Sequence, residues 1–451
     1  MRKQLREIGE PITLFGEGPG DRRDRLRELL TQRAELEAGE DDGDVQMGEA
    51  AQNSTAQGEQ EEEFYTEGIQ ELLEARKAIA LYSLPRAKAR IATQKLESTI
   101  PLRTHIKHRK ALKDRLSNFS LFGSQIAGDR PVSIARFSPN GDIIATGNWG
   151  GGVKLLSVPN LEETKVLRGH TDRVGGISWY PGSTLPSTTV SPGSVNLASS
   201  GGEGNIHLWS LTQETPLSTL SGHTARVCRI EFHPSGAYLA SASYDTTWRL
   251  WDVATTTELL LQEGHSREVY ALSFNTDGAL LASAGLDSIG RIWDLRTGRT
   301  VMILDGHIRE IYALDWSPDS HRVLSGSGDG WIKCWDVRMV RGTGGVGAHK
   351  GVVSDLRWFK SPADSPLSQP QTDRATGEIT QPKKSGTFFV SSGFDKSVNV
   401  FSADDWALCG RLQGHAGNVL GVDVSADGRY IASCGHDRTV KLWGFEDPGG
   451  I

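Results

Sequence analysis

Residues 264–294 read GHSREVYALSFNTDGALLASAGLDSIGRIWD, and this stretch decides the fold of most of the chain. Along 269–274 the side chains alternate with the two-residue period of a β-strand, and an Asn-Thr-Asp-Gly turn follows. A short apolar run at 280–283 precedes a second turn, and 291–293 forms a third predicted strand. Residues 299–303 supply a fourth. Four short strands in roughly 40 residues predict one blade of a β-propeller.

The same unit recurs along the chain. Each copy opens with Gly-His or a variant of it, and most copies carry an aromatic residue nine positions later and end on an apolar residue followed by Trp. Seven units result, the first beginning near Gly128 without its histidine. These units resemble WD repeats, so the expected fold is all-β: a seven-bladed WD40 β-propeller. The opening histidines of the other units are His170, His223, His265, His307, His349 and His415.

A β-propeller is closed by strand pairing that completes its last blade. The last unit ends after Phe445 with no room for a fourth strand, whereas residues 119–126 lie just before the first unit and have strand character. Pairing of this segment with the seventh unit would remove an exposed sheet edge. We therefore expect residues 119–451 to form one propeller domain.

Two units are longer than the others. The extra residues fall at 181–196 and at about 360–386, in each case between the first and second strands of the unit. Both stretches are rich in Pro, Ser, Thr and Gly, as exposed loops are. Because they interrupt the same connection, we expect them to project from the same face.

A recurring set of His, Ser, Asp and Trp residues superficially resembles a hydrolase triad. One set is His265, Ser283, Asp287 and Trp293. Because a catalytic triad does not repeat at a fixed period, we interpret these sets as hydrogen-bonded chains within the blades. Three units depart from the pattern and should be less rigid or held by other contacts. The departures are Gly150 and Leu156 in the first unit, Glu203 in the second and Phe401 in the sixth.

The region before the propeller divides by charge. Residues 35–63 contain eleven Asp or Glu and no Lys or Arg, and such a segment cannot bury enough apolar surface to offset its ordering entropy. It is predicted to be a disordered acidic linker.

Residues 64–118 are predicted to be helical and basic. We expect one helix to begin near Ile69, a second to begin at Pro85, and a third to carry an apolar stripe. That stripe comprises Ile106, Leu112, Leu116 and Phe119. Like charges spaced four residues apart repel one another on a helix, and phosphates would relieve that repulsion. A solvated face whose apolar side packs on the propeller is the alternative, and it is compatible with RNA contact. The candidate RNA-binding residues are Arg86, Lys88, Arg90, Lys107, Arg109, Lys110, Lys113 and Arg115.

Residues 1–34 are too few to bury their own apolar side chains. A helix is predicted from Asp21 to about Ala34, after a segment that Pro and Gly keep from being helical. The segment should dock on a partner protein. The candidate partner-binding residues are Ile12, Leu14, Phe15, Leu26, Leu29 and Leu30.

This N-terminal segment carries a second resemblance. LREIGEPITLFGEGPGDRRDRL at residues 5–26 closely resembles the splicing factor motif, and YSLPRA at 82–87 supports the same assignment. Together with a seven-unit propeller, these stretches resemble the pre-mRNA-processing factor four family, the WD-repeat subunits of the U4/U6 small nuclear ribonucleoprotein. Residues 1–34 are accordingly assigned as the splicing factor motif.

The resemblance implies a non-catalytic scaffold of the U4/U6 snRNP and tri-snRNP that works in the nucleus. The implied partners are pre-mRNA-processing factor three, U4/U6 snRNA, a cyclophilin on the N-terminal motif, and other tri-snRNP proteins. We expect no membrane association and no homo-oligomer.

Two other function classes are alternatives. A substrate-recognition adaptor, for example of a ubiquitin ligase, would use the same ring, because fold does not fix function. An enzyme has no support beyond the repeated His-Ser-Asp sets. The four cysteines lie far apart and the remaining histidines lack metal-ligand spacing, so we expect no catalytic residues, no cofactor and no metal site.

Overall fold

The computed structural model describes residue 29 and residues 68–445, except 187, 189, 363, 364 and 373–378. The predicted acidic linker at 35–63 lies outside the described residues. The ring and the two helices before it belong to the unit that begins at Glu62.

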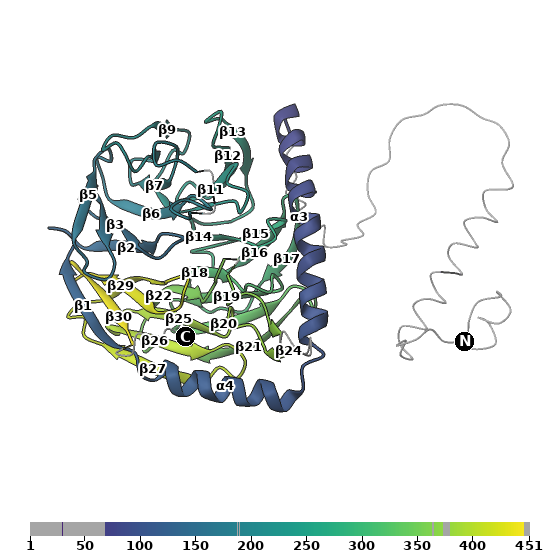
Figure 1. The fold of residues 1–451 in the computed structure, drawn as a ribbon. Coiled ribbons are helices and arrows are strands. Elements are labelled where there is room, and N and C mark those ends of the chain that lie inside the picture. The colour runs from purple at the N-terminus through teal and green to yellow at the C-terminus, as the bar shows by residue number, and fades with distance from the viewer. Residues whose placement is uncertain are drawn as a thin grey trace, which may run out of the picture. The chain divides into compact units, whose positions relative to one another are not determined.

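Within the described residues, seven four-stranded antiparallel sheets form the ring (Figure 1). The innermost strand of each sheet contacts the innermost strands of its two neighbours, and the contact between β28 and β2 completes the circle. The predicted seven-bladed propeller is therefore confirmed. Blade one is β2 (Val132–Phe137), β3 (Ile143–Asn148), β4 (Val153–Ser157) and β5 (Glu163–Leu167); blade two is β6 (Val174–Trp179), β7 (Leu197–Gly201), β8 (Ile206–Trp209) and β9 (Ser218–Leu220); blade three is β10 (Val227–Phe232), β11 (Tyr238–Ser243), β12 (Trp248–Asp252) and β13 (Glu258–Gln262). Blade four is β14 (Val269–Phe274), β15 (Leu280–Gly285), β16 (Gly290–Asp294) and β17 (Arg299–Leu304); blade five is β18 (Ile311–Trp316), β19 (Arg322–Ser327), β20 (Trp331–Asp336) and β21 (Arg341–Gly347); blade six is β22 (Val353–Trp358), β25 (Phe388–Gly393), β26 (Ser397–Ser402) and β27 (Leu408–Gln413).

Blade seven joins the two ends of the propeller. It consists of β28 (Val419–Val424), β29 (Tyr430–Gly435), β30 (Thr439–Gly444) and β1 (Ser120–Ile126). β1 runs antiparallel to β30, with Ile126 opposite Thr439 and Ser120 opposite Gly444. The predicted closure by the segment before the first unit is confirmed.

Two helices precede the ring: α3 (Gln70–Glu97) and α4 (Leu102–Leu116). The expectation that Pro85 starts a new helix is wrong, because Pro85 lies inside α3. Proline has no N–H for the carbonyl of Leu81, but Leu81 is 75% exposed, so water can satisfy that carbonyl. Contacts with the propeller on both sides of Pro85, from Ile79 and Arg90, hold the helix together.

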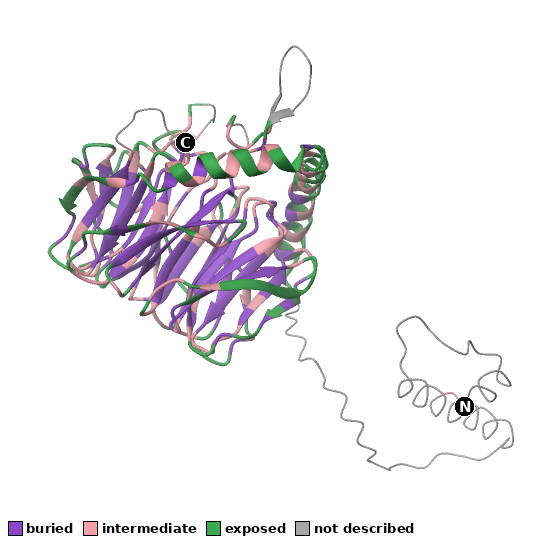
Figure 2. Ribbon diagram, turned by 90° about the horizontal axis from the view of Figure 1, so that it is seen from below, coloured by how far each residue is buried: buried purple, intermediate pink, exposed green. Residues whose placement is uncertain are grey.

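Both helices lie against the same side of the propeller (Figure 2). Leu72, Ala75 and Ile79 of α3 are buried in one cluster with residues of blades three and four. Leu112 and Leu116 of α4 are buried with residues of blades six and seven. The predicted stripe of α4 is only partly right, since Ile106 is 59% exposed and Phe119 follows the helix.

The long connections fall where the sequence places them, between β6 and β7 and between β22 and β25. They are less exposed than expected: Ser183, Asn196 and Pro382 are buried. The second connection contains a hairpin of β23 (Gln371–Thr372) and β24 (Ile379–Gln381), and it contacts α4. Its Lys383 pairs with Glu97 of α3 at 3.3 Å and also pairs with Asp319 of blade five. The insertion is therefore part of the platform that holds the helices.

Candidate nucleic-acid interface

α3 crosses the turns at one end of the blades. Tyr82 lies against the ring of His233, in the turn after β10, with 5.5 Å between the ring centroids. Arg90 pairs with Asp277, in the turn after β14. Gln94 Nε2 donates to the carbonyl of Asp319, in the turn after β18. One end of three consecutive blades therefore carries this helix.

The eight candidate RNA-binding residues divide into two groups. Three of them pair with carboxylates of the propeller: Arg90 Nε lies 2.8 Å from Asp277 Oδ2, Arg109 Nε lies 2.9 Å from Asp404 Oδ2, and Lys113 pairs with Asp405. Asp404 and Asp405 lie in the turn before β27, so these contacts hold α4 on blade six. These three basic residues attach the helices to the ring, a role that neither the RNA-contact interpretation nor the solvated-face alternative assigned to them.

Four of the five other candidates face outward, whereas Arg115 is half-buried, with its guanidinium 5.9 Å from the centre of the Phe445 ring. Arg86, Lys88, Lys107 and Lys110 are exposed. The guanidinium of Arg86 lies 4.2 Å from the centre of the Tyr82 ring, which keeps its charge near the surface of α3. Like charges this close together on an exposed helix attract a polyanion.

A groove of about 530 Å³ separates part of α4 from the end of the blade-six insertion. Its basic lining comprises Arg103, Lys107, His108, Arg115 and Lys384. Burial lowers the pKa of His108, and the charges of Arg109, Lys384 and His105 lower it further. The cationic side chains around His108 give this surface a positive local field, as an anion-binding surface needs. Lys384 joins the candidate set only through the fold, because it is far from α4 in the sequence.

The N-terminal candidates cannot be placed in the same way. Ile12, Leu14, Phe15, Leu26 and Leu30 lie outside the described residues. Leu29 is described, and it is helical and partly buried.

The repeated His-Ser-Asp-Trp sets form hydrogen-bonded chains inside the blades. In blade four, His265 Nδ1 lies 2.8 Å from Asp287 Oδ2 and His265 Nε2 lies 2.8 Å from Ser283 Oγ. Trp293 Nε1 donates to the same hydroxyl at 2.8 Å. The equivalent chains begin at His223, His307 and His415. Each serine hydroxyl is buried between a histidine and a tryptophan, which is a structural arrangement.

The three blades that depart from the His-Ser-Asp-Trp pattern still contain hydrogen bonds at the equivalent positions. Glu203 replaces the aspartate in blade two, and its Oε1 lies 2.5 Å from His170 Nδ1. In blade six His349 still contacts Asp395 and Ser391, although Phe401 has no N–H to donate. In blade one the side chain of Asn148 accepts hydrogen bonds from the backbone N–H groups of Gly150 and Gly152 and holds the turn in place of the missing acid.

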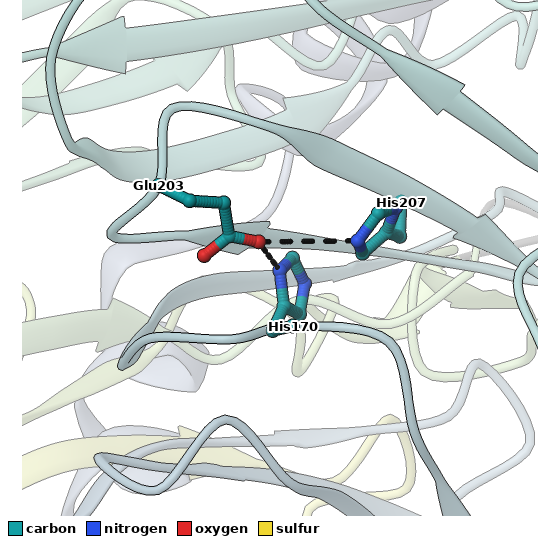
Figure 3. A group of neighbouring side chains, drawn as sticks. All are labelled: His170, Glu203 and His207. Atoms are coloured by element: carbon teal, nitrogen blue, oxygen red, sulfur yellow. Dashed lines mark hydrogen bonds and ion pairs between the residues drawn. The ribbon is translucent and has the colours of Figure 1, made fainter.

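One group of neighbouring side chains is not predicted by the sequence patterns. In blade two the fold brings His170, Glu203 and His207 together, with their potential ligand atoms all within 4.8 Å of one another (Figure 3). The expectation that the histidines outside the repeat sets lack metal-ligand spacing rested on short local motifs, whereas this group combines the repeat histidine His170 with Glu203 and His207 from two other elements. The sequence signal for this group is His207, which lies two residues before Trp209. In the other blades the equivalent strand position holds Lys, Arg or Asn.

Buried ion pairs join the innermost strands of different blades. Arg136 of β2 reaches past the neighbouring β28 to Asp355 of β22, with 2.9 Å between Nη2 and Oδ2 and both side chains at most 6% exposed. Arg229 of β10 lies 3.6 Å from the other oxygen of Asp355. Burial alone would raise the pKa of Asp355, but the charges of Arg136, Arg229 and Arg357 lower it. These charges neutralise one another and brace the innermost strands.

Comparison with known proteins agrees with this architecture. Residues 2–29 match the model described as pre-mRNA processing factor 4 (PRP4) like. Residues 161–210, 214–252, 257–294, 298–336 and 406–444 match the WD domain, G-beta repeat model. The U4/U6 small nuclear ribonucleoprotein PRP4 of Saccharomyces cerevisiae is 38% identical over 98% of this chain and 89% of its own length. The chain belongs to the PRP4 family.

Other relatives match over shorter stretches. An uncharacterized WD repeat-containing protein of Schizosaccharomyces pombe is 44% identical over 238 residues, which is 53% of this chain and 49% of that protein. The bovine U4/U6 small nuclear ribonucleoprotein Prp4 is 40% identical over 43% of this chain. The chain spans about half of the fission yeast protein and 36% of the bovine PRP4-family member.

The fold and the family agree on a WD-repeat protein. Among the residues that the structure describes, no helix is both long enough and apolar enough to cross a bilayer. The four cysteines are unpaired, and three of them are buried. The PRP4-like match covers the segment that resembles the splicing factor motif, so the two resemblances seen in the sequence are confirmed.

Proposed function

We propose that this chain is a non-catalytic scaffold subunit of the U4/U6 snRNP and the tri-snRNP in pre-mRNA splicing. Membership of the PRP4 family along nearly the whole chain is the observation that carries the proposal. The ring acts by recognition. It presents two faces and a rim to partners, while the segment before it offers a second attachment that raises the effective concentration at the first.

The proposed RNA contact is the outward face of the two helices. Lys107 and Lys110 are exposed on α4, and the groove beside that helix has a basic lining. The helices are held by ion pairs to the ring, so the outward charges are presented on a fixed support. Such an arrangement would contact the phosphates of U4/U6 snRNA by charge and geometry rather than by reading bases.

The proposed protein partners are pre-mRNA-processing factor three, a cyclophilin and other tri-snRNP proteins. The N-terminal apolar residues Ile12, Leu14, Phe15, Leu26, Leu29 and Leu30 are the proposed docking set. These assemblies place the protein in the nucleus. The PRP4-like match at residues 2–29 favours this function over the ubiquitin-ligase adaptor.

Purification of the tagged full-length chain from nuclear extract tests the proposal. We expect U4 and U6 RNAs to be recovered with it, and recovery should fall when Lys107 and Lys110 are both changed to Glu. Lys350→Glu is the matched control, since Lys350 is exposed beside His349, at the opposite end of the blades from the turns that carry α3 and α4. Complexes without either RNA would contradict the function. Equal losses in the double variant and the control would contradict the proposed surface.

A further inference from the structure

Blade two holds a cluster of potential metal ligands from three elements. His170 lies in the loop before β6, Glu203 lies in the turn between β7 and β8, and His207 lies on β8. Figure 3 shows the carboxylate of Glu203 directed at both imidazoles. Glu203 Oε1 lies 2.5 Å from His170 Nδ1 and 3.9 Å from His207 Nε2.

In each imidazole, the ring nitrogen that points away from Glu203 contacts a hydroxyl group. His207 Nδ1 lies 2.9 Å from the hydroxyl of Thr219, and His170 Nε2 lies 2.6 Å from that of Ser199. Such second contacts orient a metal-binding histidine, because they fix the ring and leave the other nitrogen directed at the ion. Both imidazoles are therefore positioned with one nitrogen toward Glu203.

The cluster is shielded from water and has an unused donor. The side chain of His170 is fully buried, and those of His207 and Glu203 are 9% and 16% exposed. Glu203 Oε2 is buried and has no hydrogen-bond partner. An unpaired buried carboxylate oxygen is costly, and a bound cation would satisfy it.

His207 is unusual among the residues at its strand position in the seven blades. Where blade two has His207, blade three has Arg249, whose Nη2 lies 3.6 Å from the turn acid Asp245. A permanent cation thus lies beside the carboxylate in blade three, whereas blade two has the imidazole of His207 at that position, a side chain that can bind a metal ion. The residues at this strand position in the other blades are Lys154, Arg249, Arg291, Lys333, Asn399 and Lys441.

We infer that His170, Glu203 and His207 bind a Zn²⁺ ion that joins the loop before β6 to the turn and strand that follow β7. Two imidazole nitrogens and one carboxylate form a known donor set for zinc, in which a single water molecule is the fourth ligand. Bond lengths of about 2.0–2.2 Å require donors about 3.4 Å apart. The carboxylate of Glu203 would move away from His170 and toward His207, and its side chain has the rotatable bonds to do so. The site is independent of the proposed RNA contact.

Zinc titration of the chelator-treated full-length protein tests the inference. We expect one tight zinc equivalent, a rise in the thermal unfolding midpoint on zinc addition, and a cobalt absorption spectrum typical of nitrogen and oxygen ligands in low coordination. His207→Arg restores the side chain of blade three and should fold, yet it should lose at least tenfold in zinc affinity. Glu203→Gln should lose affinity as well.

His436→Gln is the matched control, because His436 lies outside the cluster and should be dispensable for zinc binding. Equal zinc affinity in wild type and His207→Arg would overturn the inference. Absence of binding to the wild type at micromolar free zinc would also overturn it, and the cluster would then be a hydrogen-bonded chain like those of the other blades.

Discussion

Arg90 Nε lies 2.8 Å from Asp277 Oδ2, and this ion pair fastens the second half of α3 to the turn after β14. The Asp277 side chain is only 9% exposed, so loss of its partner would leave a poorly solvated carboxylate. We predict that Arg90→Ala lowers the free energy of unfolding by about 1–2 kcal/mol. Hydrogen exchange should show faster opening of α3 beyond Pro85.

The control for this prediction is Lys88→Ala, which removes an exposed charge from the same helix. Its effect on the free energy of unfolding should stay below about 0.5 kcal/mol. In a double-mutant cycle, Asp277→Ala should cost little more when Arg90 is already alanine. Additive losses would mean that the two side chains act independently.

The buried serine hydroxyls of blades four and six should contribute different amounts to the free energy of unfolding. Ser283→Ala in blade four leaves both His265 Nε2 and Trp293 Nε1 without their partner. We predict a loss of about 2–3 kcal/mol, measured by denaturant unfolding. Ser391→Ala in blade six leaves only His349 Nε2 unpaired, because Phe401 has no N–H, and should cost about 1–2 kcal/mol. Equal losses in the two blades would refute the role assigned to the tryptophan.

Much of the fold follows from periodicity. A histidine repeated every 42 residues from His223 to His349 sets the length of one blade, and the aromatic and Trp marks of the other units bring the count to seven. The missing strand of the last unit points to its replacement by residues 119–126. Those inferences need only local spacing. The course of α3 through Pro85 does not follow from spacing, because contacts with distant blades offset the lost hydrogen bond.

The candidate sites depend on contacts that local patterns do not contain. Arg109 and Lys110 are neighbours with similar charge, yet only Arg109 pairs with Asp404, nearly 300 residues away. Which basic residues hold the helix and which remain outward is therefore decided by the ring. Likewise, His170 and His207 come together only because β6, β7 and β8 share one sheet.

His233 should make stability depend on pH. It is fully buried in the turn after β10, where its Nε2 contacts the carbonyl of Gly278 and its Nδ1 accepts from the N–H of Ser235. Burial lowers the pKa of His233 from 6.5 to about 4, and the charge of Arg86 also lowers it. The unfolded chain therefore binds a proton between these two values that the folded chain does not bind.

The contribution of neutral His233 to the free energy of unfolding is fully present above pH 6.5 and is lost as the pH falls toward 4. The loss amounts to about 3 kcal/mol at most. His233→Gln keeps a donor for Gly278 but does not titrate. We predict that the variant's free energy of unfolding falls less steeply across this window. Parallel curves for the two proteins would contradict the assigned pKa.

Salt dependence should separate the two groups of basic residues on α4. If Lys107 and Lys110 each contact a phosphate of a U4/U6 RNA duplex, Lys107→Ala and Lys110→Ala should each reduce the slope of log affinity against log salt by about 0.7–0.9. Arg109→Ala provides the comparison, because its guanidinium is paired with Asp404 and releases no counterion on RNA binding. It should weaken the docking of α4, which hydrogen exchange reports, while leaving the salt slope unchanged. A change of slope in Arg109→Ala with none in the two lysine variants would reverse the assignment of holding and binding residues.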